Sequence, residues 1–293
     1  MIFVIDKPSG MTSHDVVARM KRAIGGKVKI GHTGTLDPMC TGVLPVLTDR
    51  DTKLSDLLGG DKEYVATMRL GLVTDTQDIT GTVLESKSSD GISESDVEKT
   101  LSSFVGKIEQ LPPMYSSVKV GGKKLYELAR EGKTVERKAR TITVYEIEYL
   151  GKIAEEEYKF RIACSKGTYI RTVIDDVGRT LGCGACMTSL RRTKANGFSV
   201  SDAVPLEKAE ELAREGHLAS VARSSEECFD GLGRCTVPEN GLRFYLNGGA
   251  IGEKRLSDVT KKTSLMKAYS EGGVFLGLCR FEKGEVKAVW TRI

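Results

Sequence analysis

The order of strand-like and helix-like stretches limits most strongly which fold this chain can adopt. That order lacks the regular strand–helix–strand alternation of a parallel α/β fold. Residues 64–70 alternate between two faces, as a half-buried strand does, and one face is formed by Tyr64, Ala66, Met68 and Leu70. Residues 142–150 and 158–164 alternate in the same way and follow each other almost directly. Strands that neighbour strands, with helices between other pairs, predict the α+β class.

Helices are predicted where apolar side chains recur at helical spacing. Ser13 is expected to cap the first helix and Ser93 the second. A third helix follows the SKGT turn at 165–168, and a short fourth spans residues 206–215. The residues expected to face the core are Val16, Val17, Met20 and Ile24, then Val97, Leu101 and Phe104, then Ile170, Val173, Ile174, Val177 and Leu181.

The chain length of 293 residues corresponds to about two domains. From about Arg234 onward the sequence becomes short strands separated by glycines, which predicts a separate small β domain. We therefore expect one domain over residues 1–233 and a second over 234–293. The stretch 112–140 has prolines, glycines and many cations, and is expected to be the least compact part of the first domain.

The chain carries a net charge of +4 and a pI near 8.6, which permits a polyanionic partner without requiring one. Its cations gather in three places. They are Lys119, Lys123, Lys124, Arg130, Lys133, Arg137, Lys138 and Arg140; then Arg191, Arg192 and Lys194; then Lys254, Arg255, Lys261, Lys262 and Lys267. Tyr115 and Tyr126 lie within the first group, so phosphate contacts and base stacking are favoured over a small-molecule substrate.

Other classes of protein fit the sequence poorly. The five apolar residues at the amino terminus are too few for a signal peptide, and no later run is long enough to span a membrane, so a cytoplasmic protein is expected. Seven cysteines, an odd number, do not suggest a disulfide scaffold. Cys183 and Cys186 have CxxC spacing but no second ligand pair, and with only three histidines a zinc site is not expected.

The segment GHTGTLDP holds a candidate catalytic carboxylate, that of Asp37. Its glycines allow a close approach of a ligand, and Pro38 favours an extended backbone at Asp37. His32 lies five residues upstream. Local reasoning alone favours a structural turn over catalysis. The adjacent Asp175 and Asp176 diverge on a helix and are expected to be structural rather than a catalytic pair.

Several segments, taken in order, resemble the motifs of the bacterial tRNA pseudouridine-55 synthase family (TruB). They are KPSGMTS at 7–13, GHTGTLDPMCTGVLP at 31–45, KEYVATMRLG at 62–71, TDTQDITG at 74–81, PPMYSSVK at 112–119, SKGTYIRTVIDDVG at 165–178 and GCGACMTSLRRT at 182–193. The resemblance covers residues 1 to about 205. It implies a mixed, largely antiparallel central sheet flanked by helices, with an RNA-binding, PUA-like domain at 234–293.

The resemblance also implies a reaction. The uridine N1–C1′ bond breaks, the base turns and C5 joins C1′, without metal or cofactor. Asp37 takes the place of the essential aspartate, and whether it attacks the base, attacks the sugar or removes the 2′ proton stays open. Tyr64 matches the tyrosine that stacks on the base and is suited to remove the C5 proton. Arg171 matches the arginine paired with the aspartate.

Further residues match substrate contacts of that family. Tyr169 and Leu190 correspond to residues that line the uracil pocket, and His32 to the histidine that holds the flipped nucleotide out of its stack. The segment LTDRDTK after GVLPV and Cys186 depart from the family pattern, which leaves the local packing in doubt but not the chemistry.

The expected partner is the T-arm stem-loop of tRNA, bound by a monomer without guide RNA and without a membrane. The alternatives are a guide-RNA-dependent relative of archaeal and eukaryotic type, and an RNA-binding or RNA-folding protein without catalysis. A metal-dependent nuclease would need a carboxylate cluster that the spacing does not provide.

Overall fold

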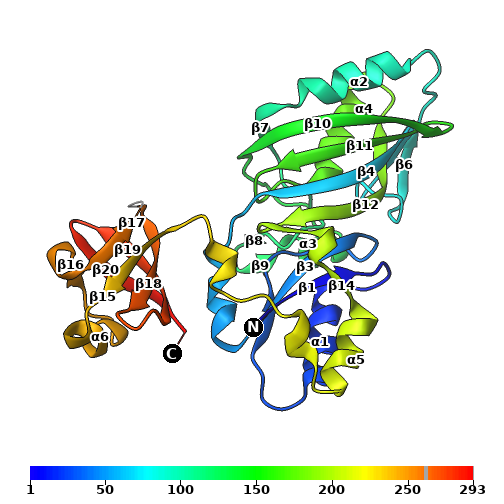
Figure 1. The fold of residues 1–293 in the computed structure, drawn as a ribbon. Coiled ribbons are helices and arrows are strands. Elements are labelled where there is room, and N and C mark those ends of the chain that lie inside the picture. Colours follow the sequence, from blue (N-terminus) through cyan, green and yellow to red (C-terminus); the bar gives the residue numbers. More distant parts are fainter. Residues whose placement is uncertain (261–262, 293) are drawn as a thin grey trace.

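A computed structural model describes residues 1–260 and 263–292. Its largest element is a ten-stranded mixed sheet (Figure 1). Along its main path the strands are β14 (Val204–Pro205), β1 (Ile2–Lys7), β3 (Thr41–Thr48), β12 (Ala185–Ala195), β4 (Lys62–Leu70), β11 (Glu157–Cys164), β10 (Arg140–Ala154) and β7 (Gly106–Gln110). Beside this path, β13 (Phe198–Ser199) pairs with β12, and β2 (Ile30–His32) with β3.

Only the pairs β1–β14 and β3–β12 of this sheet are parallel, and the other pairs in the described residues are antiparallel. The α+β class and the largely antiparallel sheet are therefore confirmed. The alternation at residues 64–70 is that of β4, whose Tyr64, Ala66, Met68 and Leu70 are all buried. In register, Tyr64 lies between Ile162 of β11 and Arg192 of β12.

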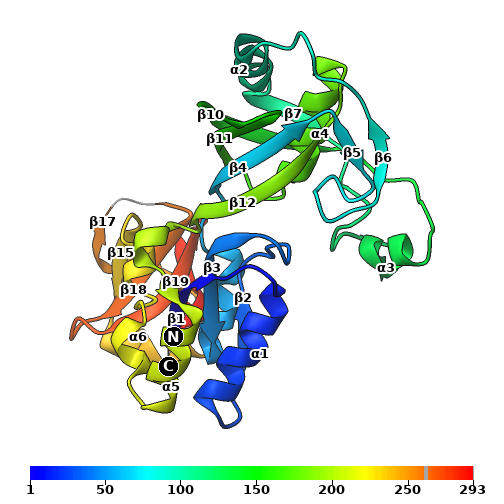
Figure 2. The ribbon, with the colours of Figure 1, turned by 90° about the vertical axis from the view of Figure 1, so that its right-hand side faces the viewer.

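Helices cover the two halves of the sheet separately (Figures 1 and 2). The α2 helix (Glu94–Ser103) and α4 (Ile170–Leu181) cover the half that contains β10, β11 and β4. Helices α1 (Ser13–Ile24) and α5 (Leu206–Arg214) pack on each other beside β1. Short 3-10 helices of three to eight residues connect elements, at Asp49–Asp56, Val200–Asp202, Leu218–Val221, Glu227–Phe229 and Glu253–Arg255.

Helix capping follows the sequence with one correction. Ser93 caps α2 through a reciprocal capping box with Asp96, as predicted. The cap of α1, however, is Thr12 and not Ser13, because Thr12 forms the capping box with Asp15. Ser13 is instead buried, and its hydroxyl both donates to and accepts from the backbone of Leu36.

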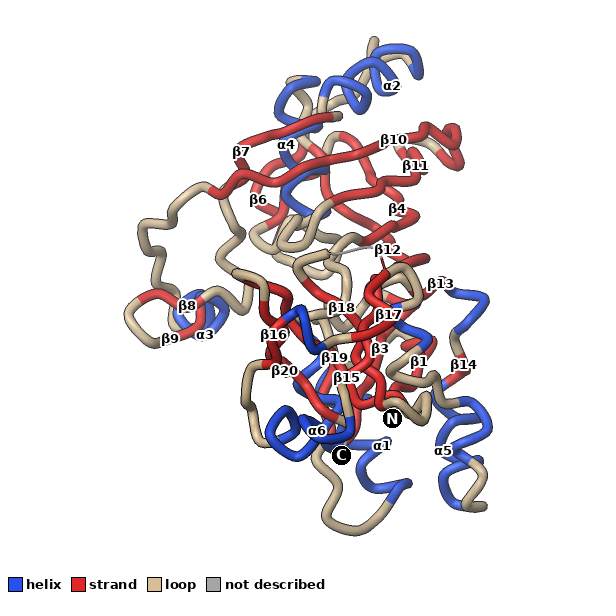
Figure 3. The backbone as a smooth tube through the Cα atoms, turned by 60° about the vertical axis from the view of Figure 1, so that its left-hand side comes forward, coloured by secondary structure: helices blue, strands red, loops and turns tan. Residues whose placement is uncertain are grey.

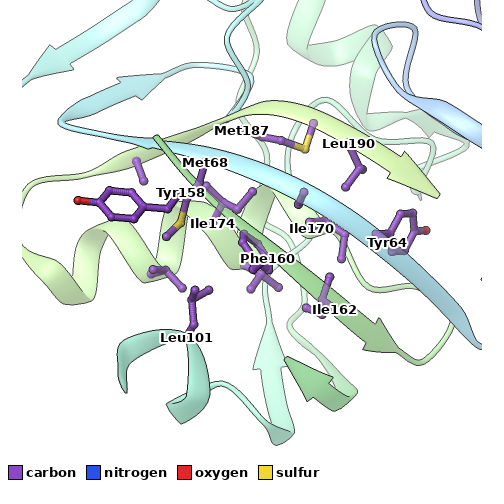
Figure 4. Packing of buried hydrophobic residues seen from close by; sticks show 14 of the residues in the cluster. Tyr64, Met68, Leu101, Tyr158, Phe160, Ile162, Ile170, Ile174, Met187 and Leu190 are labelled. Carbon is purple, nitrogen blue, oxygen red and sulfur yellow. The ribbon is translucent and has the colours of Figure 1, made fainter. Parts of the chain in front are cut away.

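The main apolar core lies between the β4 half of the sheet and helices α2 and α4 (Figure 4). Most of the predicted core positions of these helices are buried, among them Val97, Leu101, Val173, Ile174 and Val177. Figure 4 shows Tyr64 at one end of this cluster, away from Leu101 and Tyr158. The aromatic ring of Tyr64 thus closes one end of the core.

Residues 111–139 leave the main sheet as long connections that carry a small projecting unit (Figure 3). It consists of β8 (Lys119–Val120), β9 (Lys123–Lys124) and α3 (Leu125–Arg130). A second two-stranded sheet is formed by β5 (Leu72–Thr74) and β6 (Val83–Ser86). The helices of the described residues are all too short or too polar to cross a membrane.

The carboxy-terminal residues form a six-stranded sheet of their own (Figure 1). In order, its strands are β16 (Ile251–Gly252), β20 (Glu285–Thr291), β19 (Phe275–Glu282), β18 (Leu265–Ser270), β15 (Gly233–Val237) and β17 (Ser257–Thr260), with α6 (Glu239–Leu246) beside them. This small β domain was predicted from the glycine-punctuated strands. Lys261 and Lys262 of the third cationic group lie outside the described residues.

An apolar contact joins the two sheets. Phe275, Leu278 and Trp290 of the small sheet share a buried cluster with Ile2 and Val43 of the large one. The indole Nε1 of Trp290 also donates to the backbone carbonyl of Arg50 at 3.1 Å. The carboxy-terminal sheet is therefore docked on the large domain and not merely tethered to it.

Candidate active site

A cleft with a volume of about 1020 Å³ lies between four parts of the chain. They are the loop that follows β2, strand β4, the start of α4, and residues 115–130, which include the projecting unit of β8, β9 and α3. All six site residues predicted from the sequence line this cleft, although they come from distant parts of the chain. They are His32, Asp37, Tyr64, Tyr169, Arg171 and Leu190.

Buried cations hold the loop that carries Asp37. The ammonium group of Lys7, which is fully buried, donates to the carbonyls of Pro8, Pro38 and Cys40 at 2.8, 3.2 and 2.7 Å. These bonds fix the chain on the carboxyl side of Asp37. Three charge-assisted bonds also compensate Lys7 for the loss of water.

Arg192 holds the other side of the same loop. Its guanidinium, also fully buried, donates to the carbonyl of Val43 at 2.7 Å and to that of Gly34 at 3.1 Å. The role of Lys7 was not predicted from the sequence, and the prediction that Arg192 belongs to a phosphate-binding group is wrong, because its guanidinium is buried and bonded to carbonyls of the protein. Its neighbours Arg191 and Lys194 are paired with Asp6 and Glu63, so this group of cations is used mainly within the protein.

Asp37 and Arg171, which both line the cleft, form a two-point ion pair. Arg171 Nε lies 2.9 Å from Asp37 Oδ2, and Nη2 donates to Oδ1 at 3.4 Å. Arg171 is 5% exposed while the Asp37 side chain is 34% exposed, so the carboxylate still faces the cleft. Two contacts from one planar guanidinium fix the orientation of this carboxylate.

Arg171 is itself fixed by segments from other parts of the chain. It donates to the carbonyl of Thr76 at 2.7 Å and to that of Tyr115 at 2.8 Å. Asp78 Oδ2 lies 3.8 Å from Arg171 Nη1, and the hydroxyls of Thr76 and Thr80 donate to Oδ1 of the same carboxylate. Asp78 was not predicted as a site residue, although it lies within the family-like segment TDTQDITG, which could have pointed to it.

Tyr64 lines the cleft and is buried, with 6% of its surface exposed. Burial raises the pKa of its hydroxyl to about 12, and the Arg192 guanidinium partly opposes this rise. Tyr64 is therefore a neutral phenol at physiological pH, and it would need assistance to act as a base. Its ring presents an apolar surface beside Leu190, which is 7% exposed on β12.

His32 and Ser116 contribute buried polar atoms to the cleft. Among the described residues, neither His32 Nδ1 nor Ser116 Oγ has a hydrogen-bond partner. Burial lowers the pKa of His32, and the Arg192 guanidinium lowers it further, so the imidazole is neutral at pH 7. Two such atoms in one cleft fit a polar ligand that supplies the missing partners.

Tyr169 stands at the start of α4 with a fixed backbone. Its N–H donates to Gln110 Oε1 at 2.8 Å, and Gln110 Nε2 donates to its carbonyl at 3.0 Å. On the facing wall, the cations of Lys124 and Arg130 lie 5.3 and 5.5 Å from the ring centre of Tyr126. The basic stretch predicted over 112–140 thus supplies one wall of the cleft.

Other candidates from the sequence lie elsewhere. Asp175 accepts from Gln77 and pairs with Arg179, and neither it nor Asp176 lines the cleft. Cys183 and Cys186 are buried free thiols, and burial raises the pKa of Cys186 to about 11. No three His, Cys, Asp or Glu side chains of residues 1–260 and 263–292 come together as metal ligands would.

Known proteins resemble this chain over nearly its whole length. Residues 21–170 match the model of the TruB family pseudouridylate synthase N-terminal domain, and residues 171–228 that of the tRNA pseudouridylate synthase B C-terminal domain. The chain is 41% identical over 283 residues to tRNA pseudouridine synthase B of Clostridium perfringens (strain 13), covering 96% of this chain and 95% of that protein. It is 47% identical over 258 residues to tRNA pseudouridine synthase B of Alkaliphilus oremlandii, covering 88% and 84%.

Solved structures resemble the fold as well. A chain of a Cbf5–Nop10–Gar1 complex superposes with a TM-score of 0.73 at 26% identity, covering 100% of this chain and 83% of that one. A chain of an H/ACA RNP bound to a substrate RNA containing 2′-deoxyuridine gives a TM-score of 0.74 at 24% identity, covering 100% and 84%. The second likeness concerns the fold alone.

Proposed function

This chain belongs to the TruB family of pseudouridylate synthases, and from that premise we propose that it converts uridine 55 in the T-loop of tRNA to pseudouridine without a guide RNA. The observation that carries the proposal is the two-point ion pair of Asp37 and Arg171 inside a cleft large enough for a nucleotide. The relatives named tRNA pseudouridine synthase B support tRNA as the substrate.

The reaction is an isomerisation in which no atom is gained or lost. The N1–C1′ bond breaks, the C5–C1′ bond forms, the proton on C5 leaves and N1 takes up a proton. Asp37 acts next to C1′, either by bonding covalently to base or sugar or by removing the 2′ proton. Each route needs an ionised carboxylate in a fixed position, and Arg171 provides this by holding both carboxylate oxygens.

The remaining cleft residues bind the base. We assign base stacking to the ring of Tyr64, with Leu190 and Tyr169 completing the uracil pocket. Tyr64 is also the group suited to take the C5 proton. Because its pKa is raised, the phenol must give up its own proton before it takes the C5 proton, and we place this exchange late in the reaction.

Base flipping is required, since the glycosidic bond cannot be rearranged inside a stacked loop, and it costs a few kcal/mol. We assign to His32 the role of holding the flipped nucleotide. A neutral imidazole with a buried, unpartnered Nδ1 suits a hydrogen bond or stacking contact with that nucleotide. New contacts in the cleft offset the cost of unstacking.

We further propose residues 1–233 as the catalytic domain, with an RNA-contacting insertion at about 112–140, and residues 234–293 as a PUA-like RNA-binding domain. The protein is proposed to act as a cytoplasmic monomer. Identity of 41% over nearly the full length of a tRNA pseudouridine synthase B, against 26% to a Cbf5 chain, favours guide-independent action over the guide-dependent alternative.

The test measures at which position of tRNA pseudouridine forms and which residues of the protein its formation requires. The wild-type protein alone should form pseudouridine at position 55 of an unmodified tRNA transcript, measured by tritium release and mapping. Asp37→Asn should bind the transcript and release no tritium, whereas Asp176→Asn, outside the cleft, should keep activity. Normal turnover by Asp37→Asn, or product at another position only, contradicts the proposal. Tight binding without any turnover by the wild type favours the RNA-folding alternative.

A further inference from the structure

Lys62 is a cleft cation that the proposed chemistry does not use. It stands at the start of β4, two residues before Tyr64 and on the same face of the strand. Its side chain runs beside Gly34: a Cβ added to that glycine would lie 3.5 Å from Lys62 Cε and 3.6 Å from Nζ. Lys62 lines the cleft, and its ammonium has no ion-pair or hydrogen-bond partner among the described residues.

No carboxylate of the described residues forms an ion pair with Lys62. The two carboxylates of the cleft, Asp37 and Asp78, both lie against Arg171. Asp61, beside Lys62 in the chain, accepts a hydrogen bond from the Tyr145 hydroxyl at 2.9 Å.

The other neighbours of Lys62 are cationic or neutral. Burial lowers the pKa of Lys62, and the Arg192 and Lys166 cations lower it further, whereas Cys164 and the Asp61 carboxylate partly oppose this fall. Cys164 is the neighbouring thiol, and burial keeps it protonated by raising its pKa to about 11. The positive charge on this side of the cleft is therefore only partly compensated within the protein, by the Asp61 carboxylate, which makes no ion pair with Lys62.

We propose that Lys62 binds a backbone phosphate next to the flipped uridine, so that this side of the cleft is an anion subsite of the enzyme. The proposal rests on the proposed function. A uridine within RNA carries a phosphodiester on either side, and these are its only charged groups. An unpaired, half-buried ammonium opposes folding, and an incoming phosphate compensates it. Because Lys62 and Tyr64 share one rigid strand, the contact fixes the depth at which uracil enters the pocket.

The first test is a kinetic comparison on a synthetic T-arm stem-loop at several salt concentrations. Lys62→Met should raise KM on the order of tenfold, as expected for one lost charged hydrogen bond. It should change kcat much less and lower the salt-dependence slope by about 0.7 to 0.9. Lys62→Arg should restore most of the affinity. Lys99→Met, which removes an exposed lysine on α2, should match the wild type in all three measures.

The second test removes the anion rather than the cation. Methylphosphonate linkages are placed one at a time in the stem-loop. One linkage next to the target uridine should weaken the wild type as much as Lys62→Met does, and should not weaken Lys62→Met further. A wild type that is insensitive to every flanking linkage overturns the proposal, even if the variant does not fold. The proposal is also overturned if the effects of Lys62→Met and of the linkage on binding add in full, or if Lys62→Met leaves KM and the salt slope unchanged.

Stability separates a binding role from a structural one. Lys62→Met should melt at or above the wild-type temperature, because an unpaired ammonium leaves a partly buried position. A large fall in melting temperature would make Lys62 a structural residue and contradict the proposal. If the wild type forms no pseudouridine in the stem-loop at all, the proposed function fails. If the wild type is active but Lys62→Met shows no coupling to any methylphosphonate linkage, only the assignment of Lys62 fails.

Discussion

Arg171 and Asp37 are 134 residues apart in the chain, yet two guanidinium nitrogens of Arg171 contact the two carboxylate oxygens of Asp37. The same guanidinium binds the carbonyls of Thr76 and Tyr115 and lies near Asp78. Arg171 therefore joins four segments of the cleft around one carboxylate. Its planar shape is needed for this arrangement as much as its charge.

Replacing Arg171 with lysine is expected to lower kcat on the order of a hundredfold, because a point charge cannot hold both oxygens and both carbonyls. Binding of tRNA should change little, since Arg171 is buried. Single-turnover rates at saturating enzyme and a filter-binding assay separate the two effects. Arg179→Lys is the matched control, because Arg179 lies on the same helix, is exposed and pairs only outside the cleft. Equal losses in both variants would argue against a special role for Arg171.

Lys7→Met should destabilise the protein by about 3 kcal/mol, since it leaves three carbonyls near the Asp37 loop without their buried donor. The turnover of the folded fraction should also fall, because Pro38 and Cys40 lose their contact with the lysine and keep only backbone hydrogen bonds. Denaturant unfolding and single-turnover kinetics measure the two effects. Lys27→Met, at an exposed position, serves as the control. A stable Lys7→Met protein with normal turnover would mean that the loop holds its shape without the lysine.

The local elements of the fold were predictable because their signals are local. The alternation of β4, the Ser93 cap of α2 and the apolar face of α4 depend on residues within one turn or strand. The cap of α1 was misplaced by one residue. Thr12 and Ser13 are equivalent by residue type, and only the side chain of Asp15 and the distant Leu36 backbone distinguish them.

The cleft residues could be named from the resemblance, but their supports could not. Lys7 and Arg192 look like surface cations in the sequence, because the carbonyls that accept their hydrogen bonds and stabilise them when buried lie far along the chain. The grouping of cations misled for the same reason. Lys267 is nearly buried and pairs with Asp230, so it is not a free phosphate contact either. Charge is visible in a sequence, whereas the partner of a charge is not.

Acidification should destabilise the protein in part through His32. Burial lowers the folded-state pKa of this imidazole below its ordinary value of 6.5, so below that pH the unfolded chain binds a proton that the folded chain resists. This contribution to stability is complete above about pH 6.5 and is lost as the pH falls through the folded-state pKa. Melting temperatures between pH 5 and 7.5 should fall less steeply for His32→Gln than for the wild type. His217→Gln, at an exposed position, should follow the wild type. Parallel curves for all three proteins would contradict the assignment.

The contact between the two sheets can be tested at Trp290. This indole is 4% exposed, packs against Phe275 and donates to the Arg50 carbonyl. Trp290→Ala should cost about 3–5 kcal/mol of stability and loosen the carboxy-terminal sheet from the large domain. Trp290→Phe retains an aromatic ring and loses the hydrogen bond, so it should cost about 1 kcal/mol.

Limited proteolysis near residues 224–233 should then cut the alanine variant faster than the phenylalanine variant. Activity on an isolated stem-loop should survive in both, because the residues that line the cleft all lie between Thr12 and Leu190. Equal cleavage of both variants and the wild type would show that Trp290 does not hold the sheets together.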